Sequence, residues 1–323
     1  MTPDINDIAA AAARIKGRVL RTPLRQSTGL SEIAGIEVFL KLESLQPTFS
    51  YKIRGATNAV LKLVETGDSR PIVTASAGNH GYAMAHASAA AARSLTVYIS
   101  EDAPRTKVDA IRKAGADLRP CADYDEAERR AREHAANGDA VYISPYAHPD
   151  VIAGAGTVGL EIVEDLPSVE LIVAAVGGGG LISGIALAAP RVGVVGAENA
   201  ASTPFTHSLA AGRIVTIEVG QTIADGLTGN LDPATPTFDL VRQYAESIVV
   251  VEEAETLEAV RMMFLEERLV VEGAAAVAVA AVRAGRVELR GRRTAIVVSG
   301  ANIDASTWRR TIDLQRPSVL RVE

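Results

Sequence analysis

The sequence predicts an α/β protein with two domains, each built on a mostly parallel sheet flanked by helices. Three observations lead to this class. Short apolar segments alternate with helical ones along most of the chain, as in parallel sheets whose strands are connected through helices. At 323 residues the chain is long enough for two domains or one large one. Its hydrophobic residues, 48% of the total, are mainly Ala, Val, Leu and Ile, which suit tight packing of helices on strands.

The N-terminal part combines a helix, a strand and a second helix that follows a lysine. Apolar residues at helical spacing predict a helix within 1–16, and alternation predicts a strand over 36–42. The helical pattern resumes over 54–65. Lys52 therefore lies at a loop-to-helix junction, where its side chain can project into a cleft.

The remaining elements continue the alternation of strands and helices. Residues 69–144 are predicted to form a small domain inserted into a larger one, which comprises 1–68 and 145–323. The stretch 226–238, rich in Gly, Asn, Asp and Pro, indicates a loop. The predicted strands are 71–74, 95–99, 118–120, 140–143, 171–176, 193–197, 248–251 and 295–298, and the predicted helices are 79–92, 105–114, 123–136, 157–164, 181–188, 254–267 and 272–282.

The overall composition excludes several classes of function. A net charge of −6 and an aromatic fraction of 4% argue against nucleic acid as a partner. The single cysteine, Cys121, excludes an internal disulfide and a multi-cysteine metal site, and it suits a reducing compartment. The most apolar stretches, such as 274–282, are too short to span a bilayer, and residues 1–16 lack the pattern of a signal peptide. We expect a cytoplasmic protein without a membrane partner.

Lys52 is the candidate around which the other motifs are arranged. A lone lysine is usually a solvated surface charge, but three further stretches, 74–81, 177–180 and 299–302, change this interpretation. A lysine amine that forms an imine, a backbone cradle for phosphate, an asparagine for a phenolic oxygen and a serine for a ring nitrogen are together what pyridoxal phosphate requires.

The glycine run Gly177-Gly178-Gly179-Gly180 closes a predicted strand and opens a predicted helix. Exposed backbone N–H groups and the helix dipole favour an anion at such a position. A flexible turn is the alternative. A dinucleotide site is another, because Glu198 follows the next strand, but the G-x-G-x-x-G spacing is absent and Lys52 would stay unexplained.

The stretch 76–81 also joins a strand to a helix, so its N–H groups could hold a carboxylate. In the alternative, Ser76 or Asn79 is an ordinary helix cap and His80 is a packing residue. No pair of histidines has the spacing of metal ligands; they are His80, His86, His134, His148 and His207.

With these motifs the sequence resembles the fold-type II pyridoxal-phosphate enzymes, whose fold is similar to that of the tryptophan synthase β subunit. Within them it resembles the threonine/serine dehydratase and serine racemase family. The motifs that match run along almost the whole chain and are 41–43 with Gln46 and Thr48, 50–56, 76–81, 153–157, 177–180, 222–226, 272–274 and 299–302.

Carried over position by position, the resemblance makes Lys52 the catalytic lysine that forms the imine, with Tyr51 beside the cofactor ring. Asn79 would contact the ring hydroxyl and Ser299 the ring nitrogen. The cofactor would lie in the cleft between the two domains. Its phosphate would be bound by Gly177, Gly178, Gly179 and Gly180, and the substrate carboxylate site would be lined by Ser76, Ala77, Gly78, Asn79 and His80.

The sequence departs from the family pattern at three places. Phe49 stands where the family usually has glycine, and Tyr51 where phenylalanine is common, so the pocket need not be that of a plain threonine enzyme. Family members that bind a divalent cation use a glutamate, a backbone carbonyl and an aspartate; the corresponding residues here are Glu198, Ser202 and Pro204. One carboxylate is missing, so no metal is predicted.

The resemblance implies a dehydratase, or ammonia-lyase, that converts a β-hydroxy amino acid such as threonine or serine to a 2-oxo acid and ammonia. A homodimer or homotetramer is expected. Family racemases carry a serine at the position of Ala77, which favours elimination here. The alternatives are a dehydratase for hydroxyaspartate or a phenylserine-like substrate, a serine racemase, a silent cofactor-binding protein and a nicotinamide-dependent oxidoreductase.

Overall fold

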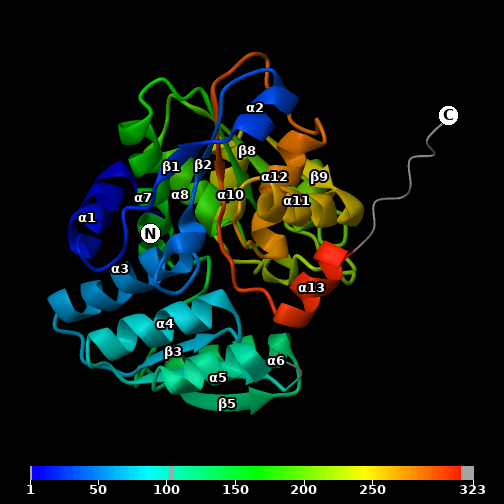
Figure 1. The fold of residues 1–323 in the computed structure, drawn as a ribbon. Coiled ribbons are helices and arrows are strands. Elements are labelled where there is room, and N and C mark those ends of the chain that lie inside the picture. Colours follow the sequence, from blue (N-terminus) through cyan, green and yellow to red (C-terminus); the bar gives the residue numbers. More distant parts are fainter. Residues whose placement is uncertain (1, 102, 104, 314–323) are drawn as a thin grey trace.

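The computed structural model describes residues 2–101, 103 and 105–313 and contains two sheets covered by helices, which confirms the predicted α/β class (Figure 1). The smaller sheet lies below the larger one in Figure 1, with helix α3 (Lys52–Glu65) between them. All strands of the smaller sheet fall within 69–144, as the proposed inserted domain requires. The core of that sheet also includes Ile53 and Val60 of α3, so the lysine helix joins the two parts.

The larger sheet has six strands in the order β1-β2-β10-β7-β8-β9. β1 pairs with β2 antiparallel, and all other pairs are parallel. The smaller sheet has the order β5-β4-β3-β6 and is parallel throughout. The strands are β1 (Leu24–Gln26), β2 (Val38–Lys41), β3 (Ile72–Ala75), β4 (Leu95–Ser100), β5 (Asp117–Cys121), β6 (Val141–Tyr142), β7 (Leu171–Ala175), β8 (Gly193–Asn199), β9 (Ser247–Val251) and β10 (Thr294–Val297).

Alternate residues of the central strands serve two different cores, because successive side chains of a strand point to opposite faces. In β7, Leu171 and Val173 pack with α11 and α12, whereas Ile172 and Ala174 pack with α7 and α8. The other helices are α1 (Ile5–Ile15), α2 (Thr28–Ala34), α4 (Asn79–Ala90), α5 (Arg105–Lys113), α6 (Tyr124–Ala136), α7 (Pro149–Asp165), α8 (Gly180–Ala188), α9 (Pro204–Ala211), α10 (Thr237–Tyr244), α11 (Glu253–Leu265), α12 (Gly273–Arg283) and α13 (Ala305–Asp313), with short 3-10 turns η1 (Glu43–Leu45) and η2 (Asp225–Leu227).

The prediction that a helix begins at residue 157 is wrong, because α7 begins at Pro149. The Ala-Gly repeat at 153–156 argues against a helix, since glycine costs about 1 kcal/mol relative to alanine there. Close helix packing overrides that cost. A methyl group at Gly154 would lie 2.6 Å from the Cα atom of Gly55, and one at Gly156 would lie 2.8 Å from the carbonyl oxygen of Gly184. Short helices α2, α9, α10 and α13 were also not predicted.

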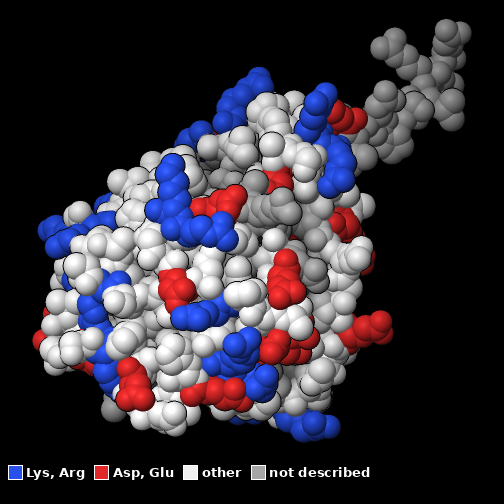
Figure 2. All heavy atoms as spheres, turned by 90° about the horizontal axis from the view of Figure 1, so that it is seen from below, with Lys and Arg blue, Asp and Glu red and all other residues white. Residues whose placement is uncertain are grey.

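The outer surface of the smaller sheet does not suggest a polyanion partner. On the face shown in Figure 2, Lys and Arg side chains alternate with Asp and Glu rather than gathering in one basic patch. Among the described residues, none of the helices has the length and apolar character that a membrane span requires.

A buried ion-pair network fixes the start of α3. Arg54 is fully buried and donates to both oxygens of the buried Glu43, at 2.7 and 2.8 Å, and also to Glu161 of α7. Lys41 of β2 donates to the same Glu161 at 2.6 Å. Burial alone would raise the pKa of Glu43, but the charge and hydrogen bonds of Arg54 outweigh it and place that pKa below its ordinary value. The network ties together α3, α7 and β2.

Replacing Arg54 by leucine should lower the free energy of unfolding by about 3–5 kcal/mol, because Glu43 would keep a buried charge without its main partner. Urea denaturation of the parent and Arg54→Leu proteins measures the difference. Arg112→Ala is the control, since Arg112 and Asp109 form an exposed pair at 2.6 Å, and such pairs contribute at most about 1 kcal/mol. Equal losses in the two variants would contradict the assigned role of the network.

Candidate functional site

Three of the predicted site segments lie where parallel strands end. The stretch 76–81, which leads into α4, follows β3; the glycine run 177–180 follows β7, and Ser299 follows β10. β7 and β10 are parallel neighbours, so their carboxyl ends meet at one edge of the larger sheet. Open α/β sheets bind ligands at this edge.

The lysine segment is paired with the segment that carries Ser299. The backbone N–H of Tyr51 donates to the carbonyl of Ser299 at 3.0 Å, and that of Ala301 donates to the carbonyl of Phe49 at 2.8 Å. An isolated antiparallel bridge joins Ser50 to Gly300 between them. This pairing places the beginning of α3 directly beside the end of β10.

The Lys52 amine is held by a carbonyl group. Its Nζ donates to the carbonyl oxygen of Pro145 at 2.8 Å and lies 5.2 Å from the centre of the Tyr51 ring. Lys52 is half-buried, and no ion pair of this lysine occurs within the described residues. An amine held only by a neutral acceptor is easier to release for chemistry than one held by a carboxylate.

The glycine run forms a backbone cradle that has no room for side chains of its own. Gly179 has a left-handed φ of +82°, and Gly180 is the first residue of α8. A methyl group at Gly178 would lie 2.2 Å from the Tyr146 ring, and one at Gly179 would lie 2.5 Å from the Phe205 ring. The N–H groups at the start of α8 have no helical partner and favour an anion. The cradle therefore fits a phosphate group.

The asparagine loop meets the larger sheet through side-chain hydrogen bonds. Asn79 opens α4, and its Nδ2 donates to Glu272 at 2.7 Å. Asn302 donates from its Nδ2 to Oδ1 of Asn79, also at 2.7 Å. Ser76 accepts from the backbone N–H of Gly78 at 3.2 Å. Glu272 and Asn302 lie in motifs that carry the family resemblance, but the sequence alone gave them no role.

The side chain of His80 is buried in surroundings that disfavour its charged form. It is 2% exposed, and a polar contact with the backbone of Ile143 offsets only part of the cost of charging the ring. Burial and, secondarily, the charge of Lys52 hold the pKa of His80 well below its usual value. Only its backbone N–H, in the first turn of α4, could contribute to a carboxylate site, together with the half-buried Ala77 and Gly78.

Glu198 acts as a helix cap. This buried carboxylate in β8 accepts from the backbone N–H groups of Phe205 and Thr206, at 2.8 and 2.9 Å, and from the Thr206 hydroxyl at 2.6 Å. It thereby satisfies N–H groups at the start of α9, whose Phe205 ring packs beneath Gly179. Within the described residues no three carboxylates, histidines or cysteines gather around a common centre, and the prediction of no metal stays a prediction.

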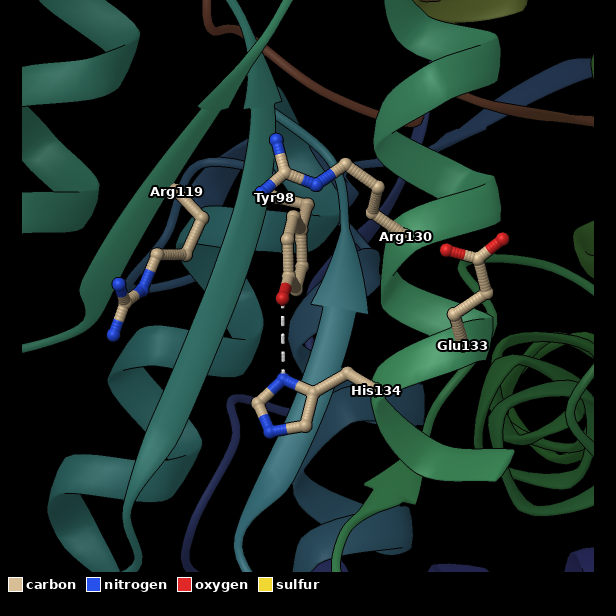
Figure 3. A pocket seen from close by; sticks show the side chains of 5 residues that line it. All are labelled: Tyr98, Arg119, Arg130, Glu133 and His134. Carbon is tan, nitrogen blue, oxygen red and sulfur yellow. Dashed lines mark hydrogen bonds between the residues drawn. The ribbon is translucent and has the colours of Figure 1, made fainter. Parts of the chain in front are cut away.

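A hollow of about 340 Å³ on the smaller sheet is separate from these residues (Figure 3). It is lined by side chains of β4, β5 and α6, and the Tyr98 hydroxyl lies 3.3 Å from Nδ1 of His134. Arg119 is paired with Asp117, and Arg130 donates to the carbonyl of Pro120. None of the predicted site residues lines the hollow, and we assign it no function.

Comparison with known proteins identifies relatives along almost the whole chain. Residues 15–300 match the family described as "Pyridoxal-phosphate dependent enzyme". An L-threonine ammonia-lyase of Thermotoga maritima is 40% identical over 96% of this chain and 78% of its own length. The catabolic L-threonine dehydratase TdcB of Escherichia coli K12 is 35% identical over 94% of each chain. The structure of maize serine racemase superposes with a TM-score of 0.88 at 32% identity and covers 97% of both chains.

Replacing Gly178 by alanine should weaken binding of pyridoxal phosphate about tenfold or more, because the new methyl group collides with Tyr146 and displaces the cradle. Titration followed by cofactor fluorescence measures the affinity. Gly29→Ala is the control, since the new methyl group would meet mainly the movable side-chain end of Glu266, at 3.0 Å.

A second substitution separates this collision from general damage. In Gly178→Ala/Tyr146→Ala the ring is gone, so part of the lost affinity should return. If Gly178→Ala binds the cofactor as the parent does, the glycine run is not the phosphate cradle.

Proposed function

Because the chain belongs to the family of pyridoxal-phosphate-dependent enzymes, we propose that it is a dehydratase, or ammonia-lyase, acting on threonine or serine. It would eliminate the β-hydroxyl group and yield a 2-oxo acid and ammonia. One observation carries the proposal. Lys52 begins α3 beside the segment of Ser299, and its amine donates to the carbonyl of Pro145.

The residues present fit the cofactor group by group. Lys52 would bind its aldehyde, Gly177 to Gly180 its phosphate, Asn79 its ring hydroxyl and Ser299 its ring nitrogen. Tyr51, half-buried beside Lys52, would flank the ring. When bound, the cofactor withdraws electrons from the substrate Cα and so acidifies the proton on that carbon.

Lys52 supplies the base. With a substrate bound through the cofactor, the Nζ atom of Lys52 would be a neutral amine and would be the group that removes the α-proton. Ser299 is an uncharged partner for the ring nitrogen, which suits prompt loss of a β-hydroxyl rather than slow chemistry on a long-lived carbanion. The C–O bond would then break, and the Lys52 ammonium could return the proton it has taken, so that the hydroxyl leaves as water. The enamine product isomerises to an imine, and water hydrolyses it to the 2-oxo acid and ammonia.

The first turn of α4 would orient the substrate. Its backbone N–H groups and the Ser76 hydroxyl can hold the carboxylate, and the helix dipole supports a negative charge there. Phe49 has a left-handed φ of 55° and is 52% exposed. This backbone conformation favours glycine, which explains why the family usually has glycine at this position. Phenylalanine adopts it here at a strain of roughly 1 kcal/mol. The exposed ring fills little of the interior, so Phe49 gives no reason to depart from threonine or serine, the substrates of the relatives.

Racemisation is the second candidate, because the maize relative of similar structure is a serine racemase. It requires a proton donor on the face of the substrate opposite to Lys52. Ala77, at the position where family racemases have serine, has no proton to give. Elimination is therefore the reaction we favour. A homodimer or homotetramer and a cytoplasmic location stay predictions.

The proposed function is tested by Lys52→Ala, which should lower turnover of threonine and serine by several orders of magnitude, since both the covalent anchor and the base are lost. Release of 2-oxo acid is the measurement. Lys62→Ala serves as control, because Lys62 lies on the same helix but is 41% exposed and paired with Asp150. Near-normal turnover in Lys52→Ala would refute the assignment.

Ala77→Ser should raise the rate of serine racemisation relative to elimination, because the hydroxyl can return a proton to the second face. Chiral chromatography of serine and a 2-oxo acid assay on the same samples give the ratio. A parent enzyme that interconverts L- and D-serine as fast as it forms pyruvate would contradict the argument from Ala77.

A further inference from the structure

A chain of hydrogen bonds connects the two sheets at the asparagine loop. Asn302, after β10, donates from Nδ2 both to the carbonyl of Thr48 at 2.9 Å and to Oδ1 of Asn79 at 2.7 Å. Asn79 then donates from its own Nδ2 to Oε1 of Glu272 at 2.7 Å. Asn79 begins α4, just after strand β3 of the smaller sheet. Glu272 immediately precedes α12, which packs on the larger sheet. The Asn79 amide is thus held from two sides.

The two groups at the ends of this series of hydrogen bonds, the Thr48 carbonyl and the Glu272 carboxyl group, both act as acceptors. The Thr48 carbonyl requires that the nitrogen of Asn302 faces it, and the same nitrogen then requires the oxygen of Asn79. Independently, Oε1 of Glu272 accepts from the Asn79 side chain at 2.7 Å, which requires the nitrogen of Asn79 on that side. The two requirements agree on one orientation of the Asn79 amide. A flipped amide would place two acceptors against each other at the carboxylate and two donors at Asn302.

We infer that Glu272 and Asn302 are positioning residues that lock the Asn79 amide so that it presents an N–H donor, rather than its oxygen, to the ring hydroxyl of the cofactor. The Asn79 nitrogen carries two hydrogens, and only one is used by Glu272; the other has no partner among the described residues. The identity of the acceptor rests on the proposed function. The locked orientation rests on the hydrogen bonds alone.

The absence of a side chain at Gly300 leaves the space in which the Glu272 carboxyl group approaches Asn79. Glu272 is 4% exposed, and its backbone N–H donates to the carbonyl of Gly300 at 3.1 Å. A methyl group at Gly300 would lie 2.3 Å from Oε1 and 2.9 Å from Cδ of Glu272. Gly300 therefore permits the approach of the carboxylate to Asn79. Gly300 lies in the same segment that pairs with the lysine segment through Ser50.

The orientation matters because the deprotonated ring hydroxyl is an acceptor. A donor at Asn79 stabilises this oxygen, whereas a carbonyl oxygen in its place would repel it. Without Glu272 and Asn302, the Asn79 amide could adopt either orientation and would lose part of its affinity for the cofactor. The locking residues thus act through Asn79 and not through contact with the cofactor.

The test exchanges donor and acceptor between positions 79 and 272. Asn79→Asp alone sets two carboxylates against each other. In Asn79→Asp/Glu272→Gln the new amide can donate to the new carboxylate, and Asn302 still donates to position 79. The hydrogen bonds that connect Thr48, Asn302, position 79 and position 272 are all kept, but position 79 can no longer donate to the cofactor.

Thermal unfolding of the full chain without cofactor is the first readout. We expect a lowered midpoint in Asn79→Asp and recovery of at least half of that loss in the double variant. Additive losses would show that residues 79 and 272 are not coupled, and would overturn the locked orientation.

Cofactor affinity, from fluorescence titration, is the second readout. We expect an about tenfold or larger rise in the dissociation constant for pyridoxal phosphate in Asn79→Asp, with no recovery in the double variant. Recovery there would overturn the role of Asn79 as donor.

Gly300→Ala should weaken cofactor binding although Asn79 and Glu272 are both intact, and unchanged binding would also contradict the inference. A parent chain that binds no cofactor would overturn the proposed function, while the unfolding readout would still decide on the orientation.

Discussion

The buried pair of Arg54 and Glu43 is the interaction on which the position of the lysine depends. Helix α3 has no side-chain cap, so its own sequence does not fix where it begins. Arg54, two residues after Lys52, is anchored to Glu43 and to Glu161 of α7. On the other side, Tyr51 is held by the carbonyl of Ser299. Lys52 lies between these two anchors, and its amine is thereby directed to Pro145 and the edge of the sheet.

Glycine residues then determine how closely the surrounding elements approach. Gly55 and Gly154 allow α3 to contact α7, and Gly156 with Gly184 does the same for α7 and α8. Since α8 begins at the glycine run, this stack sets the position of the phosphate cradle relative to Lys52. Tyr146 occupies the space under Gly178, directly after the carbonyl that holds the lysine amine. Packing and chemistry therefore depend on the same few backbone contacts.

Much of this arrangement could be predicted from the sequence, because strand and helix periodicity is local. Each glycine or asparagine loop was placed after the correct strand, and both parallel sheets were expected. The start of α7 could not be predicted, because Gly154 favours the helix only through its close contact with Gly55, which the sequence does not show. The role of Glu272 was missed for the same reason, since its partner Asn79 is 193 residues away in the sequence. A contact of that kind has no local pattern.

The residue that carries the cofactor can be located on the chain by chemical trapping. Reduction of the protein with borohydride in the presence of pyridoxal phosphate turns the lysine linkage into a stable bond, and peptide mass spectrometry then finds the modified residue. We expect one modified peptide, with the added mass on Lys52. Modification spread over exposed lysines, or concentrated on another residue while Lys52 stays unmodified, would refute the assignment of Lys52.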